Sequence, residues 1–234
     1  MKLSKIIECI KNYNFIKYYL KGVSPLFELK NFLLKINSIG TLIDVGSNKG
    51  QFILLFRMYF PKIKVHSFEP QDEPLKIQKK IFKYNKINYY PYALGNKNEI
   101  KIFYQTKRED SSSLLKPKIK TKSDYKIINK KKIKVKKIKD ILNFNKLKKP
   151  IILKLDVQGF ELEVLKGFEK NIKYIDYIIT EISYLNSYTN GVSARKLIKY
   201  LNNNKFYITE RTNQTKHNGK IYQEDILLKK IMNK

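Results

Sequence analysis

Short apolar runs alternate with helical segments through the middle of the chain. The runs have the length and composition of β-strands, and they cover residues 41–45, 64–69, 87–94, 99–104, 151–157 and 177–180. Helical spacing of apolar residues occupies intervening stretches near 52–59, 74–84 and 161–167. This alternation predicts βαβ units, so we expect an α/β protein with a Rossmann-like, doubly wound, mostly parallel sheet that has helices on both faces.

Both ends of the chain differ from this middle part. Residues 194–201 have a helical pattern, and the strand-like runs 206–210 and 224–230 follow, with a turn at Asn218-Gly219 in the polar stretch between them. They predict a C-terminal antiparallel hairpin. We interpret residues 1–40 as a helical N-terminal cap on a domain of residues 41–234. The cap either packs on the domain or, as a basic amphipathic helix, makes peripheral contact with an anionic membrane surface.

The least regular stretch is 105–137. It contains Ser111, Ser112 and Ser113 and a lysine-rich run over 130–137. We expect an inserted basic loop or lid here, with its charge on a solvated face.

The chain of 234 residues carries 49 Lys and Arg against 20 Asp and Glu, a formal net charge of +29. Such charge suits nucleic acid, an anionic membrane or an acidic substrate. Only four of these residues are Arg, however, and abundant Lys, Ile and Asn is typical of a compositional bias. The single cysteine, Cys9, excludes an internal disulfide framework and fits a reducing compartment, so we expect a cytoplasmic protein.

The clearest candidate for chemistry is a glycine-containing turn between the first strand and the first helix. It runs from Asp44 through Gly46 and Asn48 to Gly50. It is neither the Gly-x-Gly-x-x-Gly dinucleotide pattern nor a P-loop, which ends in Gly-Lys-Ser/Thr. An acidic residue before two spaced glycines fits a ligand with a cationic amino acid part better than a pyrophosphate.

Glu69 ends the second predicted strand, 25 positions after Asp44, and Pro70 follows it. A carboxylate at this place in an open α/β sheet binds the two hydroxyls of a ribose. Alone, Asp44 could cap a loop and Glu69 could be an exposed charge. Together, in this order and spacing, they predict an adenosine site at the carboxyl ends of the strands.

From about 41 to 181 the sequence resembles the S-adenosylmethionine-dependent methyltransferases, and among them the FkbM family. The resemblance is carried by DVGSNKGQF, SFEP, YALG, DSSSLL and KLDVQGFELEVLKG. It implies a class I methyltransferase fold and S-adenosylmethionine as cofactor. It places the following residues at the cofactor: Asp44, Gly46 and Gly50 at the methionine end with Asn48 beside them, Glu69 and Pro70 at the ribose, and Ala93 and Leu94 at the adenine.

Asp156 lies at the end of a predicted central strand, on the same edge as Asp44 and Glu69. A hydroxyl acceptor needs a base, and Asp156 is our first candidate for that catalytic role. Glu161 and Glu181 are further candidates, as base or as groups that hydrogen-bond the acceptor, although Glu161 also suits an ordinary first-turn carboxylate. Asp156 and Glu181 could instead share a divalent metal ion, for which two carboxylates are insufficient grounds.

The family resemblance implies an O-methyltransferase that acts on a hydroxyl of a sugar or another small-molecule or glycan acceptor, typically in bacterial surface polysaccharide biosynthesis. The charge keeps a second hypothesis open, an RNA ribose 2'-O-methyltransferase in which Lys154 assists Asp156 and Glu181. A catalytically inactive methyltransferase-fold scaffold is the third hypothesis. His66 is expected to be a packed or surface imidazole, and His217 an exposed loop histidine or an alternative base.

Overall fold

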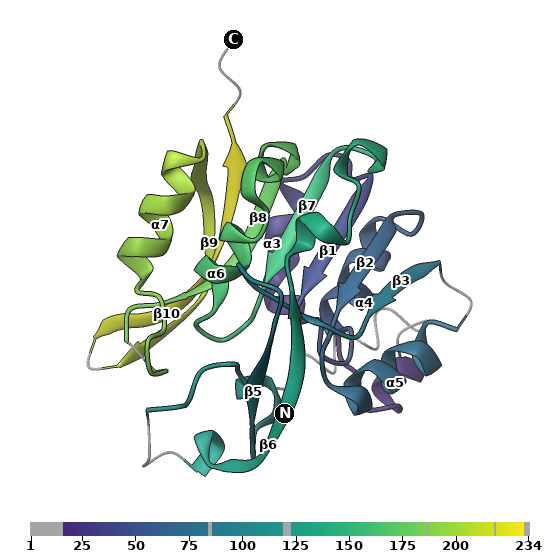
Figure 1. Ribbon diagram of the computed structural model, residues 1–234. Coiled ribbons are helices and arrows are strands. Elements are labelled where there is room, and N and C mark those ends of the chain that lie inside the picture. The colour runs from purple at the N-terminus through teal and green to yellow at the C-terminus, as the bar shows by residue number, and fades with distance from the viewer. Residues whose placement is uncertain (1–15, 84–85, 119–122, 186, 218, 232–234) are drawn as a thin grey trace.

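A computed structural model of the chain describes residues 16–83, 86–118, 123–185, 187–217 and 219–231. Its centre is a seven-stranded sheet in the order β3-β2-β1-β7-β8-β10-β9 (Figure 1). The strands are β1 (Thr41–Val45), β2 (Lys64–Phe68), β3 (Ile87–Tyr90), β7 (Ile151–Leu155), β8 (Tyr177–Ser183), β9 (Phe206–His217) and β10 (Lys220–Lys230). The first five are parallel to one another, and β10 pairs antiparallel with β8 and with β9. The Rossmann-like, mostly parallel sheet with a C-terminal antiparallel hairpin is confirmed.

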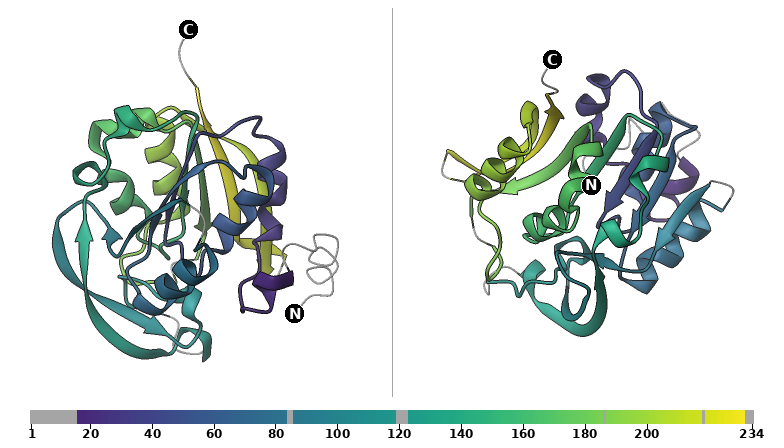
Figure 2. Two further views of the ribbon diagram at one scale, coloured as in Figure 1. Left: turned by 90° about the vertical axis from the view of Figure 1, so that its right-hand side faces the viewer. Right: turned by 45° about the horizontal axis from the view of Figure 1, so that its top comes forward.

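Helices cover both faces of this sheet (Figure 2). The helices of the central part of the chain are α4 (Gln51–Tyr59), α5 (Asp72–Ile81), α6 (Glu161–Lys166) and α7 (Ala194–Asn203). The core divides accordingly, because successive strand residues point to opposite faces. In β1, Leu42 packs with α4, whereas Ile43 and Val45 pack with α6 and α7. Burial on both faces explains why β1 and β7 are apolar without alternation.

A second sheet extends below the first in Figure 1. Its order is β4-β6-β5, with β4 (Ala93–Leu94), β5 (Glu99–Thr106) and β6 (Ile127–Lys136). The expected loop over 105–137 is therefore corrected: the lysine-rich run is mostly strand β6, paired antiparallel with β5. The expected single strand over 87–94 is also two strands, β3 in the main sheet and β4 in the second.

The remainder of 105–137 and the following segment contain short 3-10 helices. They are η3 (Glu109–Ser111), η4 (Ser123–Tyr125), η5 (Ile138–Asp140), η6 (Phe144–Lys146) and, after α6, η7 (Glu169–Tyr174). We call the hairpin of β5 and β6 the arm. Its inner face packs on the main body through Phe103 and Val135, which are both buried.

The described part of the N-terminal cap begins at α2 (Ile16–Tyr19) and continues with η2 (Phe27–Leu29) and α3 (Lys30–Leu34). Phe32 and Leu33 are buried against the sheet with α4. The amphipathic stretch before residue 16 lies outside the described residues. The described part of this region is thus made of short helices, and none of the helices in the described residues has the length and apolar character that a membrane span requires.

Candidate active site

Two loops meet at the carboxyl edge of the parallel strands, one after β1 and one after β7. Gly46 has φ +74°, and a Cβ there would overlap the main-chain carbonyl of Asp156. The Asp156 amide donates to the Val45 carbonyl at 3.1 Å, which closes the junction. Only glycine allows this backbone approach, so the glycine turn and the loop of Asp156 are held as one unit.

A buried polar cluster beneath the glycine turn fixes its shape. Gln78 of α5 donates through Nε2 to the Ser47 hydroxyl at 2.9 Å and to the Asn48 carbonyl, and it accepts from the Ser67 hydroxyl at 2.7 Å. The Ser47 and Ser67 hydroxyls are 2.7 Å apart. Asn48 itself has φ 46°, a strained conformation that these contacts stabilise.

Glu69 is 3% exposed and lies at the tip of β2, as the sequence predicts. Its two oxygens accept from backbone amides, Oε2 from Asn48 at 2.8 Å and Oε1 from Gln71 at 2.9 Å. Burial raises the pKa of Glu69 to about 7, although these two amides act in the opposite direction. Each oxygen retains a lone pair, so the carboxylate is fixed in place and can still accept two hydroxyl groups.

Beside Glu69 lies a cleft of about 600 Å³, which we call the apolar cleft. Aromatic side chains supply much of its wall, from Phe68, Tyr92, Phe103 and Phe160. Gly46, Asn48, Glu69, Pro70, Ala93 and Leu94, all predicted cofactor residues, line it. Asp44 and Gly50 do not: Asp44 lies beneath the turn with no exposed surface, and Gly50 is the N-cap of α4 against Phe82.

Two of the segments that carry the family resemblance, YALG and KLDVQGFELEVLKG, also meet at the apolar cleft. Gly95 follows the cleft residues Ala93 and Leu94, and a Cβ at Gly167 after α6 would overlap the Gly95 carbonyl. Phe160, at the start of α6, lines the cleft. The close contact therefore holds α6 and the cleft wall together.

Lys154 joins two of the predicted carboxylates. Its ammonium is 3.0 Å from Asp156 Oδ2 and 3.9 Å from Asp44 Oδ1, and its side chain is 6% exposed. Burial opposes the charge on Lys154, but Asp156 and Asp44 outweigh it and raise the lysine pKa above its ordinary value. Burial also raises the pKa of Asp44, to about 6. Lys154 thus fixes Asp156 Oδ2, while Gln158 Nε2 donates to Oδ1 at 2.8 Å.

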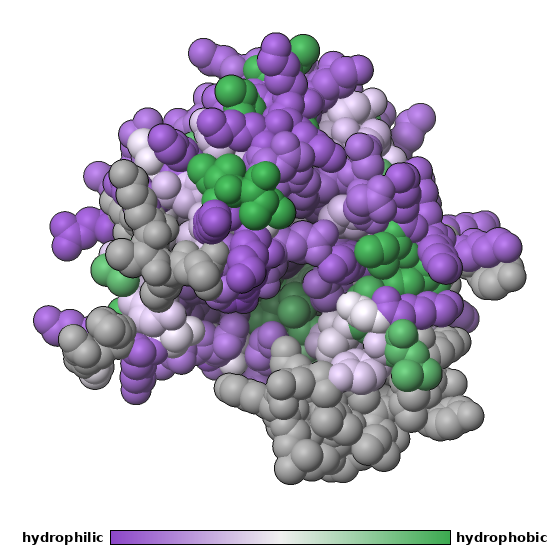
Figure 3. Space-filling view, turned by 90° about the horizontal axis from the view of Figure 1, so that it is seen from below, coloured by the Kyte–Doolittle hydropathy of each residue, from purple (hydrophilic) through white to green (hydrophobic). Residues whose placement is uncertain are grey.

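Asp156 lines both the apolar cleft and a second, larger space of about 1520 Å³. Acidic side chains dominate the wall of this second space, which we call the acidic cavity: Glu28, Asp110, Asp124, Asp156, Glu181 and Asp225, against Arg108 and Lys154. Figure 3 shows the edge of the molecule on which the arm lies, hollowed near its centre, with hydrophobic side chains in the hollow. Asp110 also lines both spaces, so a ligand in the cleft and a ligand in the cavity would meet at Asp156 and Asp110.

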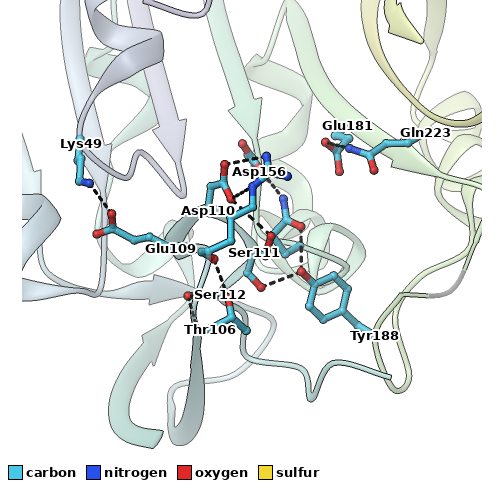
Figure 4. Close-up of polar contacts among 12 residues, drawn as sticks. Lys49, Thr106, Glu109, Asp110, Ser111, Ser112, Asp156, Glu181, Tyr188 and Gln223 are labelled. Atoms are coloured by element: carbon cyan, nitrogen blue, oxygen red, sulfur yellow. Dashed lines mark hydrogen bonds and ion pairs between the residues drawn. The ribbon is translucent and has the colours of Figure 1, made fainter. Parts of the chain in front are cut away.

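Glu181 and Asp225 face this cavity from neighbouring strands, paired in register across β8 and β10. Burial and the charges of Asp156 and Asp225 raise the pKa of Glu181 well above its ordinary value. Burial raises the pKa of Asp225 to about 7, although Asn213 donates to its Oδ2 at 2.8 Å. Gln223 Nε2 donates to Glu181 Oε2 (Figure 4).

Glu161 lies apart from both spaces. It is 5% exposed, and its Oε1 accepts from the Gly159 amide at 3.0 Å. It faces a smaller pocket shared with Glu181 and Tyr188. Its contact fixes the loop between Asp156 and α6, and burial raises its pKa to about 7.

The serine segment, whose role the sequence does not reveal, holds this region together. The Ser113 hydroxyl donates to the Gln158 carbonyl at 2.9 Å, and the Ser112 hydroxyl accepts from the Thr106 amide at 3.0 Å. The Tyr188 hydroxyl lies 2.8 Å from the Ser111 carbonyl and 3.0 Å from Gln158 Oε1 (Figure 4). Sequence reasoning missed Gln158 and Asp110, because neither residue has a spacing that distinguishes it from a loop polar group.

A salt bridge spans the edge of the cleft. Lys49, from the glycine turn, is 2.5 Å from Glu109 of η3. Glu109 and Asp110 both line the apolar cleft (Figure 4). The segment around η3 therefore forms one wall of the cleft and is tied to the opposite wall.

His66 does not contribute to this site. His66 is 7% exposed, its Nδ1 is 3.0 Å from the Tyr90 hydroxyl, and burial lowers its pKa to about 4. The side chain of His217 lies outside what the structure describes. Among the described residues, no group of three or more His, Cys, Asp or Glu side chains is arranged to hold a metal ion.

A glycine turn, a fixed carboxylate at the next strand tip and a cleft at the carboxyl edge of a Rossmann-like sheet define a nucleoside-cofactor enzyme. The sequence matches the model of the methyltransferase FkbM domain over residues 44–208, well over half of the chain. The chain belongs to this family and is an S-adenosylmethionine-dependent methyltransferase.

Solved structures include similar chains at low sequence identity. Magnesium protoporphyrin IX methyltransferase of Synechocystis PCC 6803 with bound SAM has a TM-score of 0.48 and 12% identity, covering 87% of this chain and 76% of its own. TrmK of M. capricolum with S-adenosyl-homocysteine has a TM-score of 0.47 and 13% identity, and the match covers 87% of this chain and 68% of TrmK. An rRNA methylase of Streptococcus thermophilus has a TM-score of 0.47 and 10% identity, and the match covers 86% of this chain and 93% of the methylase. These similarities say nothing about the substrate, and no curated protein sequence matches the chain.

Proposed function

We propose that the protein is an O-methyltransferase that methylates a hydroxyl of a sugar or related polyhydroxyl acceptor, in surface polysaccharide biosynthesis. The observation that carries the proposal is the meeting of the apolar cleft and the acidic cavity, whose walls share the carboxylates of Asp156 and Asp110. A donor in one space and an acceptor in the other would have these carboxylates between them, and Asp156 is the one that Lys154 and Gln158 hold in a fixed orientation.

The residues of the apolar cleft suit S-adenosylmethionine. Asn48 Oδ1 is buried without a hydrogen-bond partner in the described residues, and Glu69 has free lone pairs beside it. Glu69 would hold the ribose hydroxyls, the turn at Gly46 and Asn48 the methionine end, and Ala93 and Leu94 the adenine. The bound donor supplies an electrophilic methyl carbon that needs no further activation.

Asp156 would then act at the acceptor. Its fixed carboxylate would accept the proton of the acceptor hydroxyl while the hydroxyl oxygen bonds to the methyl carbon and the bond from that carbon to the donor sulfur breaks, leaving a neutral thioether. Lys154 and Gln158 hold its two oxygens, at 3.0 Å and 2.8 Å, so the group is oriented before the acceptor arrives. Glu181 and Asp225 would accept hydrogen bonds from other acceptor hydroxyls.

The charge of the cavity favours a polyhydroxyl acceptor over a nucleic acid. Six acidic and two basic residues line it, in a chain with 49 basic and 20 acidic residues. Arg108 is paired with Asp110 at 2.7 Å, and Lys154 with Asp156 at 3.0 Å. Glu181 and Asp225 form no ion pair with a basic side chain in the described residues, so a phosphodiester chain would meet acidic groups there, whereas neutral hydroxyls would find hydrogen-bond acceptors. We place the reaction in the cytoplasm because the lone Cys9 suits a reducing compartment.

The test is to incubate the purified protein with methyl-labelled S-adenosylmethionine and a cell extract, then to separate glycan, nucleotide-sugar, nucleic-acid, lipid and small-molecule fractions. Asp156→Asn is the control, because it should bind donor and transfer little label. Label in glycan or nucleotide sugar supports the proposal. Label in RNA would overturn it in favour of ribose methylation, and donor binding without label in any fraction would favour an inactive scaffold.

A further inference from the structure

The outer face of the arm combines lysines with exposed isoleucines. Cross-strand partners lie on the same face of a hairpin, and the register pairs Ile100 with Lys134, Ile102 with Lys132, and Tyr104 with Lys130. Alternation along β6 adds Ile128 and Lys136 to this face. We call these eight residues the outer arm face.

Exposed apolar side chains are concentrated there. The described residues include nine exposed large hydrophobic residues, and three of them, Ile100 (66% exposed), Ile102 (46%) and Ile128 (65%), belong to this one face. Lys130, Lys132 and Lys134 are exposed as well. Scattered single hydrophobics need no explanation, but three on one hairpin face next to lysines indicate contact with a partner.

No other part of the chain that the structure describes buries the isoleucines of this face. The opposite face of the same hairpin packs inward, with Phe103 at 7% and Val135 at 1% exposure. Phe103 lines the apolar cleft, so the outer arm face is separated from the cleft by one layer of strands. Within the described part of the chain, no acidic side chain forms an ion pair with Lys130, Lys132 or Lys134.

We infer that the outer arm face docks on a membrane surface that contains anionic lipids. Lysine ammonium groups pair with lipid phosphates and carboxylates, while their aliphatic stems extend along apolar side chains. Isoleucines between them can enter the boundary of headgroups and acyl chains. A nucleic acid would rely on the lysines, because this face has no arginine and its one aromatic ring, Tyr104, is half-buried.

The test is flotation of the full-length protein with vesicles of phosphatidylcholine mixed with phosphatidylserine, compared with phosphatidylcholine alone. Combined Lys130→Ser, Lys132→Ser and Lys134→Ser should weaken partitioning to the anionic vesicles about 100-fold, because each lysine at such a surface contributes roughly fivefold. Combined Lys170→Ser, Lys196→Ser and Lys199→Ser is the control. It removes the same charge from exposed positions on η7 and α7 and should weaken partitioning only a few-fold.

The apolar contribution has a separate test. Combined Ile100→Ser and Ile102→Ser should remove most of the binding that survives high salt, whereas Leu34→Ser with Ile231→Ser, at two other exposed positions, should not. Donor binding by each variant verifies that it is folded. Equal partitioning of arm and control variants would overturn the inference, and so would an arm variant that loses RNA binding but keeps vesicle binding.

Discussion

Gly46 and Asp156 are in backbone contact across the junction of β1 and β7: a Cβ on Gly46 would overlap the Asp156 carbonyl oxygen. The contact couples the turn that lines the apolar cleft to the loop that carries the proposed base. A displacement of either loop would therefore move the donor and the base relative to each other.

Replacement of Gly46 by alanine tests this coupling. Gly46→Ala should lower the melting temperature and also impair donor binding, because both φ strain and overlap with Asp156 displace the turn. Gly219→Ala is a matched control, with φ +73° against +74° at Gly46 and no heavy atom within 4 Å of the added Cβ. Gly219→Ala should lower the free energy of unfolding only by the cost of the left-handed conformation, about 1 to 2 kcal/mol. Equal effects of the two variants would show that the contact with Asp156 is unimportant.

Glu69 should contribute to donor affinity. Glu69→Gln retains the shape of the side chain but replaces one carboxylate oxygen with an amide that cannot accept from the Asn48 or Gln71 amide. The affinity for S-adenosylmethionine should fall by about 1 to 3 kcal/mol, the range for a lost charged hydrogen bond. Titration calorimetry measures it, with the exposed Glu73→Gln as control. Unchanged affinity would refute the ribose role.

Asp156 should govern turnover rather than donor binding. Asp156→Asn removes the proton acceptor while leaving the side chain's size unchanged, so turnover should fall by a factor of roughly 10² to 10⁴. The donor dissociation constant should change little, because Glu69 and the glycine turn remain. If turnover stays near normal, the base is Glu181 or another group of the acidic cavity.

The main sheet could be predicted from the sequence, because strands buried on both faces are mostly apolar and lack strict alternation, as in Ile151–Leu155, where Lys154 is the only polar residue. The arm could not. Lysine alternates with apolar residues only over part of β6, and its partner β5 lies more than twenty residues earlier, so no local pattern identifies the pair.

The site shows the same division between local and distant information. Glu69 and Asp156 stand at strand tips, which sequence position identifies. Gln158 and Ser113 act through contacts to residues brought together by folding, such as the hydrogen bond of the Ser113 hydroxyl to the Gln158 carbonyl across 45 positions. No local pattern encodes such a contact, and the acidic character of the cavity likewise arises from six separate segments of the chain.

Acidic pH should stabilise the protein when no donor is bound. Burial raises the pKa values of Glu69, Glu161 and Asp225 to about 7, above the unfolded values near 4. Between about pH 4 and about pH 7 these carboxyl groups bind protons in the folded chain but not in the unfolded chain. Their contribution to stability is therefore complete below the unfolded pKa of about 4 and is lost as pH rises through about 7.

The melting temperature should therefore be higher at about pH 5 than at about pH 8. Asp225→Asn should reduce this difference, whereas Glu73→Gln, at an exposed position, should leave it unchanged. A melting temperature that rises with pH over this range would contradict the assignment.

Tyr188 should position the base loop through Gln158. Its hydroxyl lies between the Ser111 carbonyl and Gln158 Oε1, while Gln158 Nε2 holds Asp156. Tyr188→Phe should lower kcat about tenfold, corresponding to about 1.4 kcal/mol, and leave donor affinity unchanged, because Tyr188 does not line the apolar cleft. Tyr184→Phe removes a hydroxyl that binds Glu224 instead, and should retain normal kcat. Since the effect passes through one side chain, Tyr188→Phe should add little to Gln158→Ala; additive losses in this double-mutant cycle would mean that Tyr188 acts independently of Gln158.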